Sequence, residues 1–589
     1  MLSVTGGRGD DLVGDDLVAA ALARPRVRVN QVGYLPAGPK RATVITQVRA
    51  PLPFLVRADD GGVRAAGRTV PWPDADRSSG LDLHVADFSG LDAGPGRVRL
   101  EVAEPGGTLV SHWFRVADDV HASLPGDALR FFYAQRSGVE ISDDVLPGYA
   151  RPAGHLDVPP NRGDRAVRGW RGPDADRLYP GWRLDRPVDV SGGWYDAGDH
   201  GKYVVSGALP ASMLLDVGEH GGLGAGRGPS IEEEAGWQVD WLLRMQVPDG
   251  EQHAGMAFHR VHDAYWTPLP LLPHDDPAPR VLHRPSTAAT LHLAAVAAQA
   301  SRRCGDPARR DRLLTAARTA WAAAERGPTL LAPADDGAFG GGPYDDAGLD
   351  DDRYWAAAEL YLATGEALFL AALAASPCHH GAVFPTDGFG WDVLAPWTRL
   401  RLARAGRGRP GRTLPDAQRL RGELLAAADR LAALGSAQPW GQPYDPDGGW
   451  DWGSTGALLS NLMVLATAHE LAGQRRHRDA LLAGLDFLLG RNAVGLSLVT
   501  GHGTDCAHHQ RVRHFGRALD VRFPPPPPGS LAGGPASRTF PGFPGDPRFE
   551  GLPPQFCYVD EATSETTNDV CIRWNAPLVW IAAFLARTA

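Results

Sequence analysis

Three absences narrow the class of protein that this chain of 589 residues can be. Its five cysteines form no CxxC pair and are too few for a disulfide scaffold. We interpret them mostly as free thiols, with Cys506 and Cys557 as the one candidate pair. Positive charge is not in excess, because 69 acidic residues outnumber 59 lysines and arginines and the net charge is −10. That balance excludes the basic surface that binding to nucleic acid or to an anionic membrane requires.

The chain also lacks a long apolar run. No stretch approaches the roughly 18 apolar residues that cross a bilayer, which excludes a membrane protein. The first 25 residues contain four aspartates and no apolar stretch of signal-peptide length. We therefore expect a flexible segment over residues 1–25 and a cytoplasmic protein, or a secreted one if the N-terminus as written is truncated or wrongly assigned.

Two patterns of apolar spacing divide the rest of the chain. Residues 26–117 contain short β-rich runs, such as RVRVNQVGYLP and GRVRLEVAE, at the spacing typical of a β-sandwich. Over residues 118–589 the apolar residues follow helical periodicity, and several helical segments are apolar all round. The fold class that this predicts is mainly α, a large helical body preceded by a small all-β sandwich. The absence of a solenoid repeat favours closure of the helices into a barrel.

The most informative local feature is the run SGGWYDAGDHGKYV. Asp196 and Asp199 lie three residues apart in a Gly-rich turn, which allows a tight backbone and close approach of a ligand. Two neighbouring carboxylates can hold and deprotonate water, and burial and mutual repulsion separate their pKa values. Trp194, Tyr195 and Tyr203 flank them and offer aromatic faces for sugar rings. The alternative is a turn whose aspartates only cap backbone N–H groups.

A second acidic run, CYVDEATSETTND, stands just ahead of an apolar helical segment. It holds Asp560, Glu561, Glu565 and Asp569. One interpretation is helix capping, with Asn568 or Asp569 as N-cap and acidic groups favoured by the helix dipole. The other is a general acid whose carboxyl faces the DAGD turn across a cleft.

Two more polar segments are candidates for binding. The segment GHGTDCAHHQRVRH lacks an evident zinc-ligand spacing, so we expect polar substrate contacts there. The segment GGGPYDDAGLDDDRYW offers carboxylates and loop carbonyls, which suit Ca²⁺, although EF-hand spacing is absent and a solvated acidic loop is the alternative. No phosphate-binding loop, GxSxG elbow or dinucleotide fingerprint is present.

At these residues the chain resembles glycoside hydrolase family 9, the inverting cellulases with an (α/α)6 barrel. The resemblance runs from about residue 26 to the end. VNQVGYLP is similar to the opening of the family's N-terminal immunoglobulin-like domain, and FRVADD to its end. Further motifs follow in family order: ALRFFYAQRSGVEI, YARPAGH, DVSGGWYDAGDHGKYVV, LLRMQVPDG, RPSTAATLHLAAVAAQA, YWAAAELYLATG, LLGRNAVGLSLVTGHG, FPPPPPGSLAGGP and NDVCIRWNAPLVWIAAFL.

The resemblance assigns catalytic roles residue by residue. It makes Asp199 the general base and Asp196 its partner in holding the water. An inverting enzyme places its base and its acid about 6.5–9.5 Å apart. The family's acid is the glutamate of a TNE motif, but this chain reads TND, so Asp569 is the candidate acid and its carboxyl is one methylene shorter. Glu565 or Glu561 could replace it only if the loop were threaded differently.

The same resemblance suggests the substrate contacts. The family's His-His-Arg motif is interrupted here by Gln510. The candidates from this segment are His508, His509, Arg511 and Arg513. Three tryptophans are candidate sugar platforms or, alternatively, packing residues: Trp266, Trp391 and Trp452.

For metals, the family's calcium loop is matched better than its zinc site. The positions that match a structural calcium site are Gly348, Asp351, Asp352 and Asp392. Relatives often carry a Cys/His zinc site between YARPAGH and DAGD. This chain has no cysteine before Cys304, so we expect no zinc there and no organic cofactor.

The sequence thus predicts an inverting hydrolase of β-1,4-glucans or cello-oligosaccharides, an endoglucanase or a cellodextrinase. We expect a monomer whose partner is the glucan, with no nucleic acid and no membrane. Two alternatives remain at this point. One is a glucan-binding homologue that is weakened or inactive because Asp569 replaces the usual glutamate. The other is an exo-acting enzyme on a different β-linked sugar or amino-sugar chain.

Overall fold

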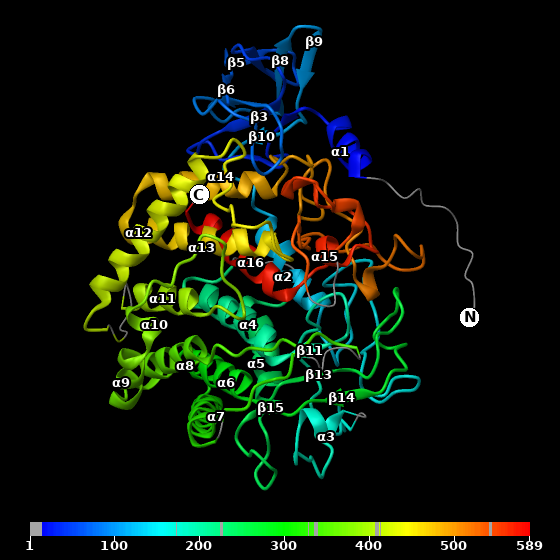
Figure 1. Ribbon diagram of the computed structural model, residues 1–589, viewed down its shortest axis with the longest axis vertical. Coiled ribbons are helices and arrows are strands. Elements are labelled where there is room, and N and C mark those ends of the chain that lie inside the picture. Colours follow the sequence, from blue (N-terminus) through cyan, green and yellow to red (C-terminus); the bar gives the residue numbers. More distant parts are fainter. Residues whose placement is uncertain are drawn as a thin grey trace.

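The computed structural model describes residues 14–588 except 172–173, 224–227, 328, 335–339, 407–411, 413 and 541–544. A small β-rich part stands at one end of a large helical body (Figure 1). Within the described residues, no helix combines the length and apolar character needed to cross a bilayer.

The β-rich part is a sandwich of two four-stranded sheets, with strand orders β1-β3-β7-β6 and β5-β4-β8-β9. Inward and outward residues alternate along β4 and β8, which closes an apolar core that includes Val44, Val56 and Leu100. A short parallel pair, β10-β2, adjoins the sheets. The strands are β1 (Val27–Arg28), β2 (Gly33–Tyr34), β3 (Arg41–Ile45), β4 (Pro53–Ala58), β5 (Val63–Arg68), β6 (Val70–Pro71), β7 (Leu83–Asp87), β8 (Val98–Glu104), β9 (Gly107–Val110) and β10 (Arg115–Val116).

The N-terminal segment corrects one prediction. Residues 14–23, which the sequence placed in a flexible segment, form helix α1 (Gly14–Ala23). Leu17 on this helix is buried with Phe549, Cys557 and Val559, so an apolar contact from far along the chain holds it. Residues 1–13 of the predicted segment lie outside the described residues.

The helical body is built on a closed inner ring, in which each helix packs against the next and α16 packs back against α4. The ring confirms the (α/α)6 prediction. Its members among the described residues are α4 (Val204–Glu219), α6 (Thr287–Ser301), α8 (Leu349–Thr364), α11 (Ala395–Arg404), α13 (Ser454–Ala472) and α16 (Ile572–Thr588). These helices are buried on nearly every side, which explains why their sequences lack a polar face; in α11 all ten residues are buried.

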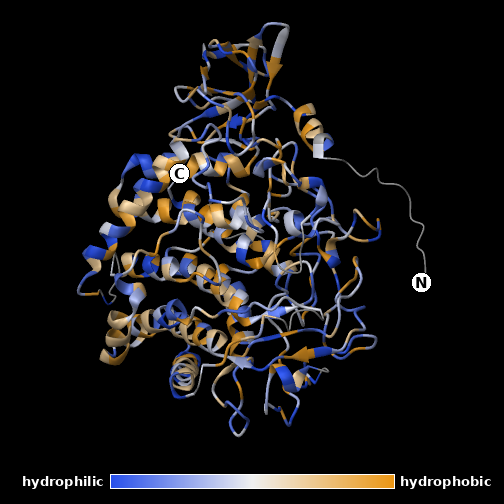
Figure 2. Ribbon diagram, viewed as in Figure 1, coloured by the Kyte–Doolittle hydropathy of each residue, from blue (hydrophilic) through white to orange (hydrophobic). Residues whose placement is uncertain are grey.

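Outer helices cover the ring. Among them, α5 packs on α4, α7 on α6, and α14 on α13. The outer set is α2 (Leu124–Ala134), α5 (Ile231–Arg244), α7 (Pro307–Arg326), α9 (Ala367–Ala375), α12 (Ala417–Ser436) and α14 (Arg475–Leu488), and short helices α3 (Ala175–Leu178), α10 (Pro377–His380) and α15 (Glu565–Asn568) lie in the connections. In Figure 2 apolar residues run along α9, whose sequence is ALFLAALAA, whereas α7 also carries polar residues.

Two small strand groups lie beside the ring and bear on the site. The antiparallel sheet β11-β13-β14 joins Lys202–Tyr203, Arg260–Asp263 and Arg280–Leu282, and β12 (Ala257–Phe258) pairs with β15 (Pro285–Ser286). Because β11 follows the DAGD turn directly and leads into α4, this sheet fixes where the turn emerges from the ring.

The cysteines are all free, as the composition suggested, and the candidate pair Cys506–Cys557 is wrong. Cys557 instead packs against α1, and Cys571 is buried at the start of α16.

Candidate functional site

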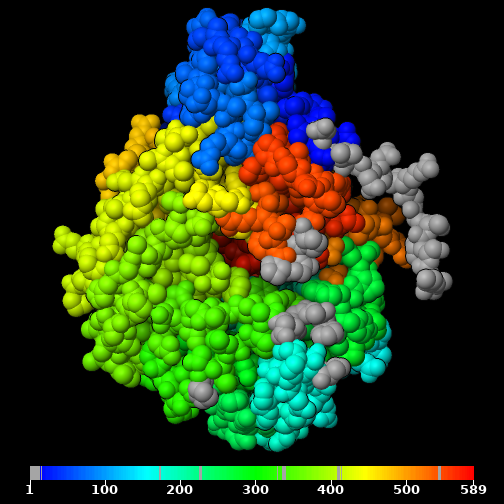
Figure 3. Space-filling model, in the orientation of Figure 1, coloured from blue at the N-terminus to red at the C-terminus, as the bar shows by residue number. Residues whose placement is uncertain are grey.

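The segments that precede α4 and α16 meet at one end of the ring. The backbone N–H of Ile572 donates to the carbonyl oxygen of Asp196 at 2.8 Å, which ties the first residue of α16 to the DAGD turn. The visible face of the molecule is hollowed near its centre, between the green-to-yellow segments and the orange-to-red segments, with red C-terminal residues at the floor (Figure 3).

Asp196 is buried beneath the turn and is held by two hydroxyls. Ser206 on α4 donates to Oδ1 at 2.5 Å, and Tyr344 donates to Oδ2 at 2.5 Å. The thiol of Cys571 lies 3.7 Å from the same Oδ2. Burial raises the pKa of Asp196 to about 6, although both hydroxyl hydrogen bonds and the positive charge of Arg573 act to lower that pKa.

Asp199 is more accessible than Asp196, and its position depends on a glycine. Its Oδ1 accepts the N–H of Gly201 at 2.8 Å, and its side chain is half-buried. A Cβ atom on Gly198 would lie only 2.0 Å from the carbonyl oxygen of Arg511 and 3.1 Å from Asp569 Oδ1. Only glycine fits there, so the turn carrying Asp199 is packed directly against the segment that presents Asp569.

Asp569 follows α15 and faces this turn. It forms a parallel bridge with Arg511, and its Oδ1 accepts the N–H of Val570 at 2.9 Å. Burial holds the pKa of Asp569 well above its ordinary value; the charge of Arg511 opposes this rise and the negative charge of Asp199 adds to it. A buried carboxyl that favours its protonated form beside a more accessible carboxylate is the arrangement of a general acid and a base.

The two other acidic candidates are occupied elsewhere. Glu565 forms an ion pair with Arg511 at 3.1 Å, and Glu561 forms one with Arg548 at 3.1 Å. Both carboxylates are thus engaged in ion pairs, and Asp569 remains the candidate acid that packs against the DAGD turn.

Three of the predicted aromatic platforms lie inside the protein instead of lining the site. Trp194 is buried with its indole N–H donating to Glu234, and Tyr195 is buried with its hydroxyl hydrogen-bonded to His155. Tyr203 is buried too, and its hydroxyl accepts the N–H of Gly342. Their assignment as sugar platforms is corrected, because they support the DAGD turn from behind.

The other three tryptophans that the sequence suggested as platforms, Trp266, Trp391 and Trp452, lie nearer the surface than Trp194. Trp266 is 47% exposed, and the guanidinium of Arg513 lies 6.0 Å from its ring centre. Trp391 is half-buried with its ring 5.1 Å from that of Tyr344, and Trp452 is half-buried against Phe540. The exposed face of Trp266 and its contact with Arg513 are compatible with a sugar platform.

The histidine–arginine segment alternates between outside and inside. His508 is exposed and His509 is half-buried beside Asp560, whereas Gln510 is buried and donates to Thr500. Arg511 reaches the surface and pairs with Glu565.

Arg513, the fourth candidate of this segment, does not face the substrate side. It is buried and donates to Thr267 and to the carbonyl oxygen of Gly198, so it braces the DAGD turn. Its assignment as a substrate contact is corrected.

Sequence reasoning missed three residues around Asp196. Ser206 and Tyr344 donate hydrogen bonds to it, and Arg573, whose guanidinium lies over the rings of Tyr344 and Trp574, contributes positive charge. Tyr344 stands in the acidic GGGPYDD run, which the sequence related only to a metal. Its left-handed backbone, with φ of 49°, is uncommon for a non-glycine residue and was not readable from the pattern.

The predicted calcium residues form an acidic cluster that fits a hard cation. Burial and the charges of Asp352 and Asp346 raise the pKa of Asp351 to about 7. Among the described residues, Oδ2 of Asp346 and Oδ2 of Asp352 are buried without a hydrogen-bond partner. Gly348 and Asp392 line the same surface hollow as Asp351. Although Oδ1 of Asp352 contacts Nε2 of His292, the other carboxylate oxygens of the cluster are the kind of donor that Ca²⁺ prefers.

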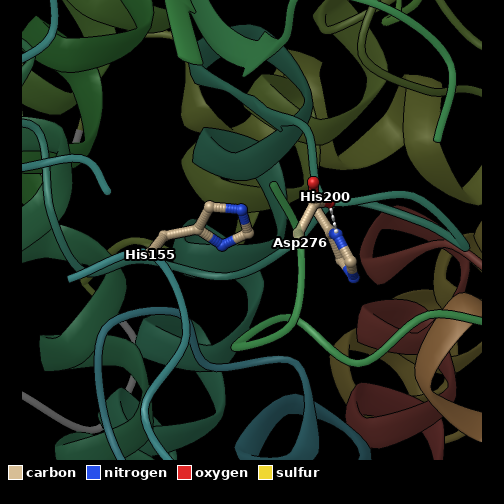
Figure 4. Close-up of side chains that lie close together, drawn as sticks. All are labelled: His155, His200 and Asp276. Carbon is tan, nitrogen blue, oxygen red and sulfur yellow. Dashed lines mark hydrogen bonds and ion pairs between the residues drawn. The ribbon is translucent and has the colours of Figure 1, made fainter. Parts of the chain in front are cut away.

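Near the position of the relatives' zinc site, buried side chains form a hydrogen-bonded cluster. The His200 imidazole is joined to Asp276 at 2.7 Å, with His155 to one side (Figure 4). Burial lowers the pKa of His155 most, and the positive charges of Arg280 and Lys202 nearby lower it further. These charges oppose a cation, and we interpret the cluster as hydrogen-bonded support for the DAGD turn.

Comparisons with known proteins agree with this geometry. The model of glycosyl hydrolase family 9 matches residues 121–582, and that of the cellulase N-terminal Ig-like domain matches residues 23–106. Endoglucanase C of Cellulomonas fimi is 45% identical over 594 residues, with 95% of this chain and 52% of that protein covered. A cellulose 1,4-β-cellobiosidase of Acetivibrio thermocellus is 36% identical, with coverage of 96% and 68%.

Solved structures are similar over almost the full chain. A metagenome-derived glycoside hydrolase family 9 endoglucanase superimposes with a TM-score of 0.79 at 32% identity, covering 95% of this chain and 98% of that one. By contrast, this chain spans only about half the length of the Cellulomonas fimi relative.

Proposed function

Because the chain belongs to glycosyl hydrolase family 9, we propose that it hydrolyses β-1,4-glucosidic bonds in cellulose-type glucans or cello-oligosaccharides, with inversion at the anomeric carbon. The observation that carries the proposal is the pairing of a half-buried Asp199 with a buried Asp569 whose pKa is raised, brought together at Gly198. Names of the relatives, an endoglucanase and a cellobiosidase, support the same bond type.

The residues divide the reaction between them. Asp199 accepts a proton from a water molecule, which attacks the anomeric carbon from the face opposite the glycosidic oxygen. Asp569 gives its proton to that oxygen as the carbon–oxygen bond breaks, so the leaving sugar departs with a free hydroxyl. Asp196, held by Ser206 and Tyr344, orients the water.

The shorter acid sets the expected efficiency. Asp569 ends one methylene before the family's glutamate, and a misplacement of about 1 Å costs on the order of 10²-fold in rate. The backbone bridge between Asp569 and Arg511 holds the loop of the proposed acid against the DAGD turn. We therefore propose a slow but competent hydrolase in preference to a protein that binds glucan without cutting it.

Product analysis with cellohexaose tests this proposal. Wild type is expected to give shorter cellodextrins whose new reducing ends first appear as the α-anomer in proton NMR. Asp199→Asn removes the base with little change of shape, so turnover should fall by more than about 10²-fold while cellohexaose affinity is retained. Intact cellohexaose with the wild-type protein, or full activity of Asp199→Asn, would contradict the assignment.

We also propose that Asp351, Asp352 and Asp392, with Gly348 at the edge of the cluster, hold a structural Ca²⁺. When bound, the ion neutralises carboxylates that burial otherwise leaves unfavourably charged. Saturating Ca²⁺ should raise the melting temperature, since binding at 100 times Kd stabilises the folded state by about 2.7 kcal/mol. Asp392→Asn should remove most of the response, and an unchanged melting temperature in EDTA would refute the site.

A further inference from the structure

Two neighbouring histidines and one aspartate converge at the surface beside Asp569. Nδ1 of His508 lies 3.2 Å from Oδ2 of Asp560, and Nδ1 of His509 lies 3.6 Å from the same oxygen. The three ligand atoms all lie within 4.8 Å of one another. Both imidazoles thus present the same nitrogen to one carboxylate oxygen, although adjacent residues in an extended segment usually point to opposite sides.

These separations match the edges of a metal polyhedron. A tetrahedral ion with bonds of about 2.0–2.1 Å places its ligand atoms about 3.3–3.4 Å apart. In this structure both Nδ1 atoms carry a proton and donate it to carbonyl oxygens, His508 Nδ1–H to Cys506 O at 2.7 Å and His509 Nδ1–H to Asp560 O at 3.2 Å. An ion that binds at Nδ1 replaces these two hydrogen bonds. Two imidazoles and a carboxylate suit Zn²⁺ or Cu²⁺ better than Ca²⁺, which prefers oxygen alone.

The surroundings allow an ion to enter. The side chains of His508 and His509 are 57% and 42% exposed. No hydrogen bond or ion pair recorded for these three side chains within the described residues involves arginine or lysine. This separates the cluster from the buried His155–His200–Asp276 group, which has Arg280 and Lys202 beside it.

A link leads from this cluster to the catalytic acid. The side-chain amide of Asn568 donates to Asp560 Oδ1 at 3.0 Å and to the carbonyl oxygen of His509 at 2.9 Å. Asn568 directly precedes Asp569. An ion bound by the imidazoles and Asp560 therefore shifts the hydrogen-bond partners of Asn568, and with them the position of Asp569.

We propose that His508, His509 and Asp560 form a binding site for a divalent transition-metal ion such as Zn²⁺, and that the bound ion slows hydrolysis. Binding alone is independent of the proposed activity, whereas inhibition rests on it. When the ion binds, each imidazole gives up its Nδ1 proton to solvent and takes one up at Nε2, so that Nδ1 offers its lone pair to the ion.

Isothermal titration of the full chain with Zn²⁺, in buffer with excess Ca²⁺ to fill the oxygen site, tests binding. We expect one Zn²⁺ per chain. His508→Ala and His509→Ala should each weaken binding more than about tenfold, since even indirect partners of metal ligands contribute about 10- to 100-fold. His508 is exposed, so its variant should fold.

Two variants serve as matched controls. His380→Ala removes an exposed histidine from another part of the surface, where Nε2 contacts Ala374 O. Cys506→Ser removes the thiol nearest to the cluster. Both should bind Zn²⁺ as wild type does. Absence of saturable binding, equal binding in His508→Ala, or loss of binding in Cys506→Ser would overturn the assignment.

Cellohexaose hydrolysis with and without Zn²⁺ tests the proposed inhibition. Inhibition should follow the binding isotherm of the wild type. In His508→Ala, whose rate with Zn²⁺ is compared with its own rate in EDTA, inhibition should need at least about tenfold more Zn²⁺. Zn²⁺ binding without any slowing of hydrolysis would overturn the inhibitory role. A chain that binds Zn²⁺ but cuts no glucan even in EDTA with added Ca²⁺ would refute the proposed function and leave the metal site standing.

Discussion

Replacing Tyr344 by Phe removes one hydroxyl hydrogen bond from Asp196 and leaves the ring in place. That hydrogen bond lowers the pKa of Asp196, which burial raises to about 6. A hydrogen bond to a charged group contributes about 1.5–3 kcal/mol, which corresponds to a pKa change of about 1–2 units. In Tyr344→Phe the pKa of Asp196 should therefore rise further.

The sign of the effect follows from the direction of that shift. If Asp196 must be ionised to orient the water, activity is lost as the pH falls through its pKa. Raising the pKa by about 1–2 units moves the acidic limb of kcat/KM upward and lowers activity by about 10- to 100-fold at pH values well below the limb. Above the limb, the variant and the wild type should converge.

The assay is the pH profile of kcat/KM on a soluble cellodextrin. Tyr149→Phe is a matched control, because its hydroxyl donates to Pro526 O and has no recorded contact with Asp196. Its profile should equal that of wild type. An acidic limb that does not move in Tyr344→Phe, with only KM increased, would show that Tyr344 contacts substrate and does not set the charge of Asp196.

Further substitutions test the other parts of the site. Asp569→Glu should raise kcat by up to about 10²-fold if reach limits the acid; a loss of activity in a folded variant would show that the loop has adapted to aspartate. Gly198→Ala should abolish activity and lower the melting temperature, because its Cβ would meet Arg511 O at 2.0 Å. As a control, Gly422→Ala at an exposed position of α12, where a Cβ has nothing within 4 Å, should stabilise the fold by roughly 0.5–1 kcal/mol. Glu565→Gln should retain activity within a few-fold in the cellohexaose assay, and complete loss would transfer the acid role to Glu565.

The sequence was enough to predict the two candidate catalytic carboxyls, but not the residues that hold Asp196 in place. Asp199 and Asp569 could be picked out because each stands in a short run whose residue types carry the signal, and the resemblance suggested their roles. The support arises from contacts across long separations in the chain. Ser206 lies on an apolar helix, and Tyr344 reaches Asp196 from a loop that the sequence related to calcium.

The aromatic residues show where composition misleads. Trp194 and Tyr195 look like surface platforms because they stand among glycines and acids. Their burial follows from the tight turn, which points both side chains toward α5 and His155. Trp266 shows the opposite case, because its sequence neighbours include Tyr265, Leu269 and Leu271 and its side chain is nevertheless exposed. The fold was easier to predict, because the apolar periodicity and the length of a helical segment can be read directly from the sequence and do not depend on its tertiary contacts.

The contact between Asp196 O and Ile572 N has a consequence for assembly of the enzyme. The proposed base precedes α4 and the proposed acid precedes α16, and the packing of these two helices closes the ring. A chain in which α16 has not yet docked has an open ring and lacks the acid at the same time. The proposed catalytic pair is therefore assembled only when the ring closes, and a partly folded intermediate with an open ring lacks it.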